Sequence, residues 1–513
     1  MTRHSAAIGA TLLVGIFYLL TLRQGHSWGD DFSMYIRHAK NLVEGVNYEE
    51  TGYIYNPEQS IAPTAYPPIF PLLLVPIYQW FGVNLQLMKV EGVLFFVASL
   101  YLIFLIFKDD FANLYIIPGI LLIGMNPFFW DHKDSISSDL AFIFFTYLCL
   151  YIIYKHFSRS QSPSSNLGSS LVTGHLIYLS YGTRSLGILL IPSLLIYDFL
   201  KNRRISLFSI QVVFIFFILV IIQTFLLHTS KSYTSQFFHT AHLLRIILRD
   251  LLMYIITVYD VFNPDIFFNN SINIVVSTAL VLFTAVLAAA GFTSRAMHRL
   301  TIIEIFIPLY LAAIILWPFW EGLRFLFPLI PFYFFYMFVG IESIAPTPHQ
   351  RIQHIASLGI ILLISVLYVH QYSRMDFGPV HGGIAEQASV ELFNFIKRQT
   401  HEQDVLIFVK PRALALYTGR SAAINHRPRD DAALWNFFRD IHATYLIIGP
   451  PGPLVGSSLV QDIALSLHPT TSVFSRGELR FLQQLVAKYP NDFQEVYTNA
   501  HFQVYKIMHR YGD

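Results

Sequence analysis

The chain has 513 residues, of which 54% are hydrophobic, 16% aromatic and only 13% charged, with a formal net charge of +2. Soluble domains carry roughly 25% charged residues, so this composition excludes an ordinary soluble protein and predicts a polytopic membrane protein. The charge gives no indication of nucleic-acid binding, and the single cysteine, Cys149, excludes an intrachain disulfide.

Membrane spans are predicted from long apolar stretches, because a helix needs about 20 apolar residues to cross the hydrocarbon core of a bilayer. The first stretch follows a short basic head, "MTRH", as in a signal peptide, but it lacks a small-x-small cleavage site. We therefore interpret it as an uncleaved first span. About eleven spans are predicted: 5–22, 86–107, 112–130, 138–156, 167–181, 186–200, 206–228, 272–292, 300–317, 325–342 and 356–371.

Two further apolar stretches are predicted to lie along the membrane surface as interfacial helices. "PPIFPLLLVPIYQWFG" (67–82) is short and rich in proline, and 242–262 carries three charged residues in its first half. With 67–82 kept out of the count, basic clusters such as "KHFSR" (155–159) and "KNRR" (201–204) fall on one side of the membrane. The positive-inside rule assigns that side to the cytoplasm. The outer side then holds loops 23–85, 130–139, 181–185, 229–271 and 317–324, with the tail from about 372.

The tail has a different composition, in which helical and strand patterns alternate. Helices are predicted at "AEQASVELFNFIKRQT", "DDAALWNFFRDI" and "ELRFLQQLVAKY", and strands at "DVLIFVK", "TYLIIGP", "FQEVYTN" and "FQVYKIM". The prediction is thus a membrane domain over 1–371 and an extracytoplasmic α/β domain over 372–513, which is a usual domain size.

Acidic and basic side chains gather on the predicted outer loops. Ionisable groups near the ends of membrane helices are costly and usually functional. A carboxylate there can act as a general base, and an arginine can hold a phosphate through paired planar hydrogen bonds. The candidates are Asp30, Asp31, Asp131, His132, Lys133, Asp134, Asp139, Arg184, Glu321 and Arg324.

Several of these segments together resemble the GT-C glycosyltransferases, the superfamily that includes protein O-mannosyltransferases and aminoarabinose transferases. The acidic pair in "WGDD" followed by "YIRHAKNLVEG" and "YPPIFPLLLVPIY" is similar to the family's first outer loop. "SSDLAFIFFTYLCLY" (137–151), "YLSYGTRSLGILLIPSLL" (178–195) and "WEGLRFLFPLIPF" (320–332) resemble later elements in the same order. "ALYTGRSA" (415–422) resembles part of the outer domain often attached to such proteins.

The resemblance implies inverting transfer of a sugar from a polyprenyl-phosphate donor to a lipid, glycan or protein acceptor. Because it is closest to bacterial members, it also implies a bacterial inner membrane. It places the general base on Asp30 or Asp31, with Asp30 favoured because it follows "WG", and a second acid on Asp139 with Asp134 as rival. Arg184, Arg324 and Lys133 would bind the donor phosphate, with Glu321, Asp134 and Tyr66 in support. Some members use a divalent metal and others do not, so no cofactor is assigned. Phe325 departs from the family pattern, in which tyrosine is common after the arginine.

Plainer interpretations of these residues remain open at the level of sequence. Asp139 could cap the following helix, since an aspartate there satisfies free backbone N–H groups. Asp134 and Lys133 could be ordinary loop charges, and Arg184 could reach lipid headgroups. Arg324 could pair structurally with Glu321. The pair His239 and His242 shares a helix face, which would permit a metal, but no third ligand stands at metal-site spacing.

Two other functions also fit a polytopic chain. In a transporter or lipid flippase the ionisable groups would gather near the bilayer midplane at broken helices, whereas here they stand at the predicted outer helix ends. A receptor or scaffold that binds through the tail would leave the acids and arginines of the outer loops without a role.

Overall fold

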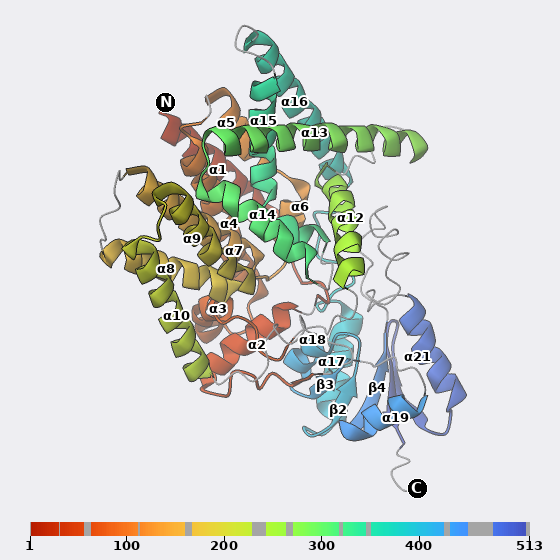
Figure 1. Ribbon diagram of the computed structural model, residues 1–513. Coiled ribbons are helices and arrows are strands. Elements are labelled where there is room, and N and C mark those ends of the chain that lie inside the picture. Colours follow the sequence, from red (N-terminus) through yellow and green to blue (C-terminus); the bar gives the residue numbers. More distant parts are fainter. Residues whose placement is uncertain are drawn as a thin grey trace.

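The computed structural model describes residues 2–29, 31–55, 63–110, 113–159, 167–227, 243–262, 270–317, 322–344, 350–424, 431–449 and 476–508. A large bundle of helices fills one part of the molecule, and an α/β domain formed by the C-terminal residues packs against one end of that bundle (Figure 1). The predicted fold class, a polytopic helical membrane protein with a C-terminal α/β domain, is confirmed.

The predicted spans correspond to helices of the bundle. Of the described helices, seven are long and apolar enough to cross a membrane, and the apolar α5, α14 and α15 are shorter. The chain is thus built as a multi-pass membrane protein. The helices are α1 (Arg3–Leu20), α4 (Leu85–Phe107), α5 (Asn113–Gly124), α7 (Asp139–Arg159), α8 (Leu167–Thr183), η2 (Ser185–Leu189) continued by α9 (Leu190–Asn202), α10 (Leu207–Leu227), α13 (Asn270–His298), α14 (Ile302–Ile315), α15 (Ile330–Ile344) and α16 (Gln350–Arg374).

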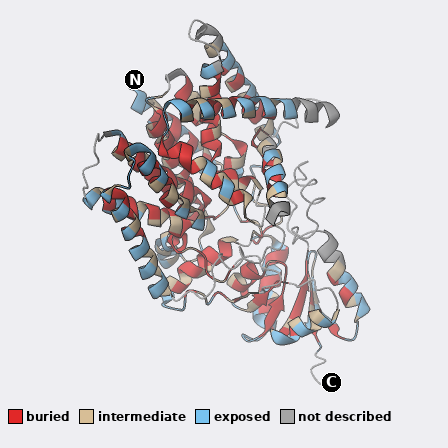
Figure 2. Ribbon diagram, in the orientation of Figure 1, coloured by how far each residue is buried: buried red, intermediate tan, exposed pale blue. Residues whose placement is uncertain are grey.

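The periphery of the bundle is apolar and exposed, as a lipid-facing surface must be. Helix α10 has a mean hydropathy of 2.8 over its best window, yet only 11% of that window is buried inside the protein. Its side chains Phe214, Ile221 and Phe225 are more than 60% exposed, and the outer faces of α10, α13 and α16 are exposed along much of their length (Figure 2). An aqueous surface would not carry apolar patches of this size.

One predicted span is interrupted. The apolar stretch 112–130 does not form one helix, because α5 ends at Gly124 and a short helix, α6 (Pro127–His132), follows it. The buried Asn126 caps α6 by accepting a hydrogen bond from the N–H of Phe128, and Pro127 at the first helical position favours a new start.

The centre of the bundle is held by close helix contacts. Helices α13 and α15 cross where Gly291 and Gly340 face each other's backbones: a Cβ built on either would lie 2.0 Å from a carbonyl oxygen of the other helix. Only glycine permits so close an approach, as at many crossings between membrane helices. The segment that carries Arg324 leads directly into α15.

Helices α3, α12 and α2 do not correspond to predicted spans. Helix α3 (Ile69–Phe81) falls in the stretch predicted to be interfacial, and it exposes Trp80 and Phe81. Helix α12 (Leu243–Phe262) falls in 242–262, the second stretch predicted to be interfacial. Helix α2 (Asp31–Glu44) was not predicted, and it lies between the bundle and the C-terminal domain (Figure 1).

The C-terminal domain is a mixed sheet with helices on both faces. The strand order is β1-β3-β2-β4-β6-β5, in which β1, β3, β2 and β4 run parallel and the last two pairings are antiparallel. The strands are β1 (Tyr53–Ile54), β2 (Val405–Ile407), β3 (Ser421–Ala423), β4 (Ala443–Ile448), β5 (Phe493–Thr498) and β6 (Gln503–Ile507). The helices are α17 (Gln387–Gln399), α18 (Pro411–Thr418), α19 (Asp431–Asp440) and α21 (Arg476–Lys488).

The first loop of the membrane domain is built into this C-terminal domain. Strand β1 comes from that loop and forms the edge of the sheet, where it pairs with β3. Successive strand residues point to opposite faces. On the face covered by α17 and α18, one hydrophobic core joins Phe32 and Phe70 of the loop to Leu392 and Leu414 of the domain. On the other face a second core packs α19 and α21. The loop and the domain therefore fold as one unit.

We expect Gly52→Ala to weaken the packing of the first loop against the C-terminal domain. Gly52 has a positive φ of 76°, and an added Cβ would lie 3.2 Å from the Cβ of Ala415 on α18. Gly45→Ala is a matched control, because Gly45 has a similar φ of 68° and open space around it. Both changes should cost about 1 kcal/mol for the left-handed backbone, but only Gly52→Ala also displaces α18. It should lower the midpoint of thermal unfolding further and expose the loop to protease. Equal effects of the two variants would contradict the described docking.

Candidate active site

The centre of the candidate site is Arg324, which bridges two carboxylates from different parts of the chain. Its Nε donates to Oδ2 of Asp139 at 2.6 Å, and its Nη1 donates to Oδ2 of Asp31 at 2.7 Å. Arg324 lies on the short 3-10 helix η3 (Gly322–Leu326), whereas Asp31 is the first residue of α2 and Asp139 the first of α7. An aspartate in the first turn of a helix is favourable because it faces free N–H groups and the positive end of the helix dipole.

Asp31 has two further donors. The hydroxyl of Tyr66 donates to its Oδ1 at 2.8 Å, and Nη1 of Arg412 lies 3.4 Å from the same oxygen. Arg412 also donates to the hydroxyl of Tyr66. Arg412 belongs to α18 in the C-terminal domain, so both domains contribute to the surroundings of this carboxylate.

Asp139 is held from its other side by Arg184, which forms an ion pair with Oδ1. Arg184 precedes η2 in an extended conformation, and its guanidinium lies 5.1 Å from the ring centre of Phe325. Phe325 is the residue that departs from the family pattern, and its apolar ring packs against the charged group as a cation–π contact. Asp139 is thus almost completely buried, and it lies between two arginines.

The electrostatics of the site favour an ionised Asp31 and a neutral His132. Burial alone would raise the pKa of Asp31, but the charges of Arg324 and Arg412, with the hydrogen bonds from Arg324 and Tyr66, outweigh it and hold that pKa well below its usual range. Beside Asp139, burial lowers the pKa of His132 to about 3, and the charge of Arg324 adds to this effect. Nε2 of His132 lies 3.3 Å from Asp139.

A buried histidine positions Tyr66. Nδ1 of His38 donates to the carbonyl of Tyr48 at 2.8 Å, and its Nε2 accepts the backbone N–H of Tyr66 at 3.2 Å. Burial lowers the pKa of His38 to about 3, so the ring is neutral and its tautomer is fixed by these two bonds. The hydroxyl of Tyr48 then donates to the carbonyl of Tyr66 at 2.9 Å. Tyr66 is thereby fixed at both its N–H and its carbonyl.

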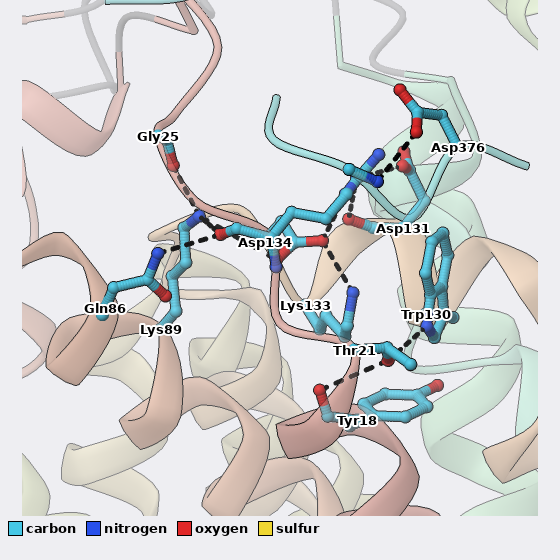
Figure 3. A network of polar contacts seen from close by, with 12 residues as sticks. Tyr18, Thr21, Gly25, Gln86, Lys89, Trp130, Asp131, Lys133, Asp134 and Asp376 are labelled. Atoms are coloured by element: carbon cyan, nitrogen blue, oxygen red, sulfur yellow. Dashed lines mark hydrogen bonds and ion pairs between the residues drawn. The ribbon is translucent and has the colours of Figure 1, made fainter. Parts of the chain in front are cut away.

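Lys133 and Asp134 lie in a second cluster, not beside Asp31 and Asp139 (Figure 3). Nζ of Lys133 donates to Asp134 at 2.7 Å and lies 3.9 Å over the ring of Trp130, and Asp134 also pairs with Arg23. Both side chains are nearly fully buried. The ammonium of Lys133, predicted to bind phosphate, is therefore already engaged by Asp134 and Trp130.

This second cluster holds the segment that leads to Asp31. Nζ of Lys89, which is buried, donates to the carbonyls of Arg23 and Gly25 at 2.8 and 2.6 Å (Figure 3). Gln86 donates to the same carbonyl of Arg23. The segment thus has bonds to α4 and, through Asp134, to the loop after α6.

The other side of the same segment contacts the start of the C-terminal domain. The N–H of Val380 donates to the carbonyl of Gln24 at 2.8 Å, and the N–H of Ile384 to that of His26 at 3.0 Å. The ring of His26 accepts the N–H of Ile136 at 3.1 Å. Asp31 therefore begins its helix from a segment held between the bundle and the domain.

Some predicted residues lie outside the described part of the chain. These are Asp30, Glu321 and the pair His239 and His242. Among the residues that the structure describes, no group of three or more His, Cys, Asp or Glu side chains is arranged to hold a metal ion.

Sequence reasoning missed Arg412. A signal was present, since "KPRALALY" follows the strand pattern "DVLIFV" directly, and the structure puts Arg412 just beyond the carboxyl end of the parallel strand β2. Ligands of α/β sheets commonly bind at that edge. The motif noted in this region, "YTGR", instead ends in Arg420, which donates to Thr400 and to the carbonyl of Lys397 within the domain.

No family model matches the sequence, and no curated protein matches it. Solved structures do match the fold. The oligosaccharyltransferase AglB from Archaeoglobus fulgidus, in complex with an inhibitory peptide and a dolichol-phosphate, is 14% identical with a TM-score of 0.54, over 86% of this chain and 69% of that chain. The oligosaccharyltransferase of the same archaeon in complex with Zn and sulfate is 13% identical with a TM-score of 0.57, over 98% of this chain and 73% of that chain.

A third match extends over both chains almost completely. ArnT from Cupriavidus metallidurans, bound to undecaprenyl phosphate, is 11% identical with a TM-score of 0.50, over 98% of this chain and 97% of that chain. AglB and ArnT are GT-C membrane glycosyltransferases. This chain has the GT-C fold. The resemblance predicted from the sequence is thereby confirmed at the level of fold.

We expect Arg324→Gln to destabilise the protein by about 2 kcal/mol, because it leaves two carboxylates without their shared cation while partial exposure moderates the loss. Combining Asp139→Asn with Arg324→Gln removes one of the two carboxylate charges that the first change leaves without this cation. The double variant should therefore unfold at a higher temperature than Arg324→Gln alone, as measured by the midpoint of thermal unfolding in detergent. Additive destabilisation by the two changes would show that the bridge carries no coupling energy.

Proposed function

We propose that this chain is a membrane glycosyltransferase that transfers a sugar from a polyprenyl-phosphate donor to an acceptor on the outer side of a bacterial inner membrane, with inversion at the anomeric carbon. The observation that carries the proposal is the bridge of Arg324 between Asp31 and Asp139, with Arg184 alongside. Carboxylates and arginines are thus within reach of one reacting centre, at the end of a bundle with the GT-C fold.

The lipid nature of the donor is supported by the fold and the lipid-facing surface. Two structures with this fold hold a dolichol-phosphate and an undecaprenyl phosphate, respectively. A donor of this kind keeps its chain in the bilayer and offers its phosphate and sugar at the end of the bundle. The apolar periphery of the bundle suits such a lipid, and the outer location follows from the basic loops at the opposite helix ends.

In the proposed reaction a carboxylate of the acidic pair, Asp30 or Asp31, takes the proton from the acceptor's nucleophilic group. The freed electron pair of the acceptor attacks the anomeric carbon from the face opposite the phosphate. The bond from that carbon to the phosphate oxygen breaks, and its electron pair stays with the phosphate. The products are the glycosylated acceptor, the polyprenyl phosphate and a protonated carboxyl group, which returns its proton to water. The contacts of Asp31 favour it for the role.

The two predicted arginines have a direct task in that step. Negative charge grows on the leaving phosphate, and Arg184 and Arg324 stabilise it with planar paired hydrogen bonds in a partly buried place. Asp139 lies between them and keeps both guanidinium groups oriented. It is a positioning residue in this proposal, not the base.

Replacement of the acidic pair tests the function. Purified protein in lipid nanodiscs is given a panel of radiolabelled polyprenyl-phosphate sugars with candidate acceptors. Asp31→Asn, or the double variant with Asp30→Asn, should lower the transfer rate by about 10²–10⁴-fold, the usual contribution of a general base. Asp431→Asn is a control, because Asp431 on α19 pairs with Lys488 and accepts a hydrogen bond from Tyr489 in the C-terminal domain, outside the site. Full transfer by both single variants and the double would overturn the proposal.

The pH profile should reveal the ion pair. Because the arginines hold the pKa of Asp31 below its usual range, kcat/KM of the native protein should stay level down to about pH 5. Arg324→Gln removes a stabilising cation and raises that pKa, so the residual activity should fall at a higher pH as the solution is acidified. Arg324→Lys keeps the charge and should leave the acid limb near its native position. An acid limb that is the same in all three proteins would exclude Asp31 as the group that titrates.

A further inference from the structure

Arg412 is a charged residue of the C-terminal domain that is buried at the candidate site. It stands at the start of α18, directly after Pro411, and only 4% of it is exposed. Burial of an arginine is costly unless its donors are satisfied. Its guanidinium meets Oδ1 of Asp31 and the hydroxyl of Tyr66, and it lies 5.8 and 5.7 Å from the ring centres of Tyr53 and Tyr66.

The position of Arg412 is fixed by the joint between the domain and the first loop. Tyr53, whose ring lies under the guanidinium, belongs to β1, and β1 pairs in parallel with β3 of the domain. The N–H of Ala422 donates to the carbonyl of Gly52 at 2.8 Å. The backbone position of Arg412 at the edge of the site is therefore set by the same contacts that join the two domains.

Arg412 and Arg324 share one partner. Arg324 contacts Oδ2 of Asp31 at 2.7 Å, and Arg412 lies 3.4 Å from Oδ1 of the same carboxylate. The shorter contact is the stronger one, so Arg412 is the cation that a stronger anion would draw away first. Arg412 approaches only one oxygen atom of Asp31, whereas a phosphate offers several negatively charged oxygen atoms. A guanidinium can bind two of them at once through its planar fork.

We infer that Arg412 is a phosphate-binding residue, supplied by the C-terminal domain, that moves from Asp31 to the phosphate of the lipid donor when the donor binds. The inference rests on the proposed function and deepens it, since it makes the C-terminal domain part of the donor site. Donor binding then has a second effect. Asp31 loses one of its cations and becomes a better proton acceptor once the donor is in place.

The test is binding of undecaprenyl phosphate, without any sugar, to the full-length protein in nanodiscs of zwitterionic lipid. Undecaprenol, the same chain without phosphate, serves as the neutral ligand. Arg412→Gln should weaken binding of the phosphate at least 10-fold and leave binding of the alcohol unchanged. Arg412→Lys should recover part of the loss, because it restores the charge but not the planar fork.

Arg420→Gln is the matched control. Arg420 is another partly buried arginine of the same domain, and its contacts are with Thr400 and Lys397 rather than with the site. Its substitution should leave the affinity for undecaprenyl phosphate at the native value. Equal weakening by Arg412→Gln and Arg420→Gln, or loss of undecaprenol binding in Arg412→Gln, would assign the effect to the fold of the domain and overturn the inference.

Other outcomes separate the inference from the proposed function. Native affinity of Arg412→Gln for undecaprenyl phosphate would overturn the inference and leave the glycosyltransferase proposal standing. A native protein that binds the phosphate no better than the alcohol would overturn both. Inorganic phosphate that competes at the same concentration as the lipid would show that the site takes a free phosphate, and it would overturn the assignment to a lipid donor.

Discussion

The shared ion pair of Arg324 is the constraint on which the site depends. Asp31 and Asp139 each begin a helix and lie close together, with Asp139 buried and Asp31 partly exposed. Like charges so close repel unless a cation lies between them. Arg324 on η3 supplies that cation for both at once. The relative positions of α2, α7 and η3 are therefore stabilised by these ion pairs as well as by side-chain packing. The close crossing of α13 and α15 further along the chain keeps the segment after η3 in place.

The second constraint is that the first loop belongs to two domains. Its core residues pack with α17 and α18, its strand β1 completes the sheet, and its start is held by Lys89 and by the backbone of Val380 and Ile384. Asp31 thus stands where the bundle, the loop and the C-terminal domain meet. The position of Asp31 therefore depends on how the C-terminal domain docks, because closely packed interfaces leave little room for independent movement.

Hydropathy predicted the bundle well, because each span must satisfy a length and composition rule that is visible locally. The break at Asn126 was missed, since the apolar stretch continues through it and only the cap and Pro127 mark the new helix. The two-residue strand β1 has no pattern of its own, as its existence depends on its partner β3. The prediction grouped Lys133 with the phosphate-binding residues by its loop alone, whereas burial beside Asp134 and Trp130 gives it another environment. Arg412 could not be paired with Asp31 without knowledge of how the domain docks.

The choice of arginine at the centre of the site has a physical reason. A guanidinium has five N–H donors in a rigid plane, so Arg324 can hold Asp139 through Nε and Asp31 through Nη1 at the same time, which an ammonium cannot do in a fixed geometry. An anion that enters this site need not displace Arg324 from Asp139. It has to compete only for the contacts of Asp31, and the weaker of these two arginine contacts comes from the C-terminal domain. In the proposed reaction, the docking of that domain would therefore set how easily the carboxylate of Asp31 can be freed to accept a proton.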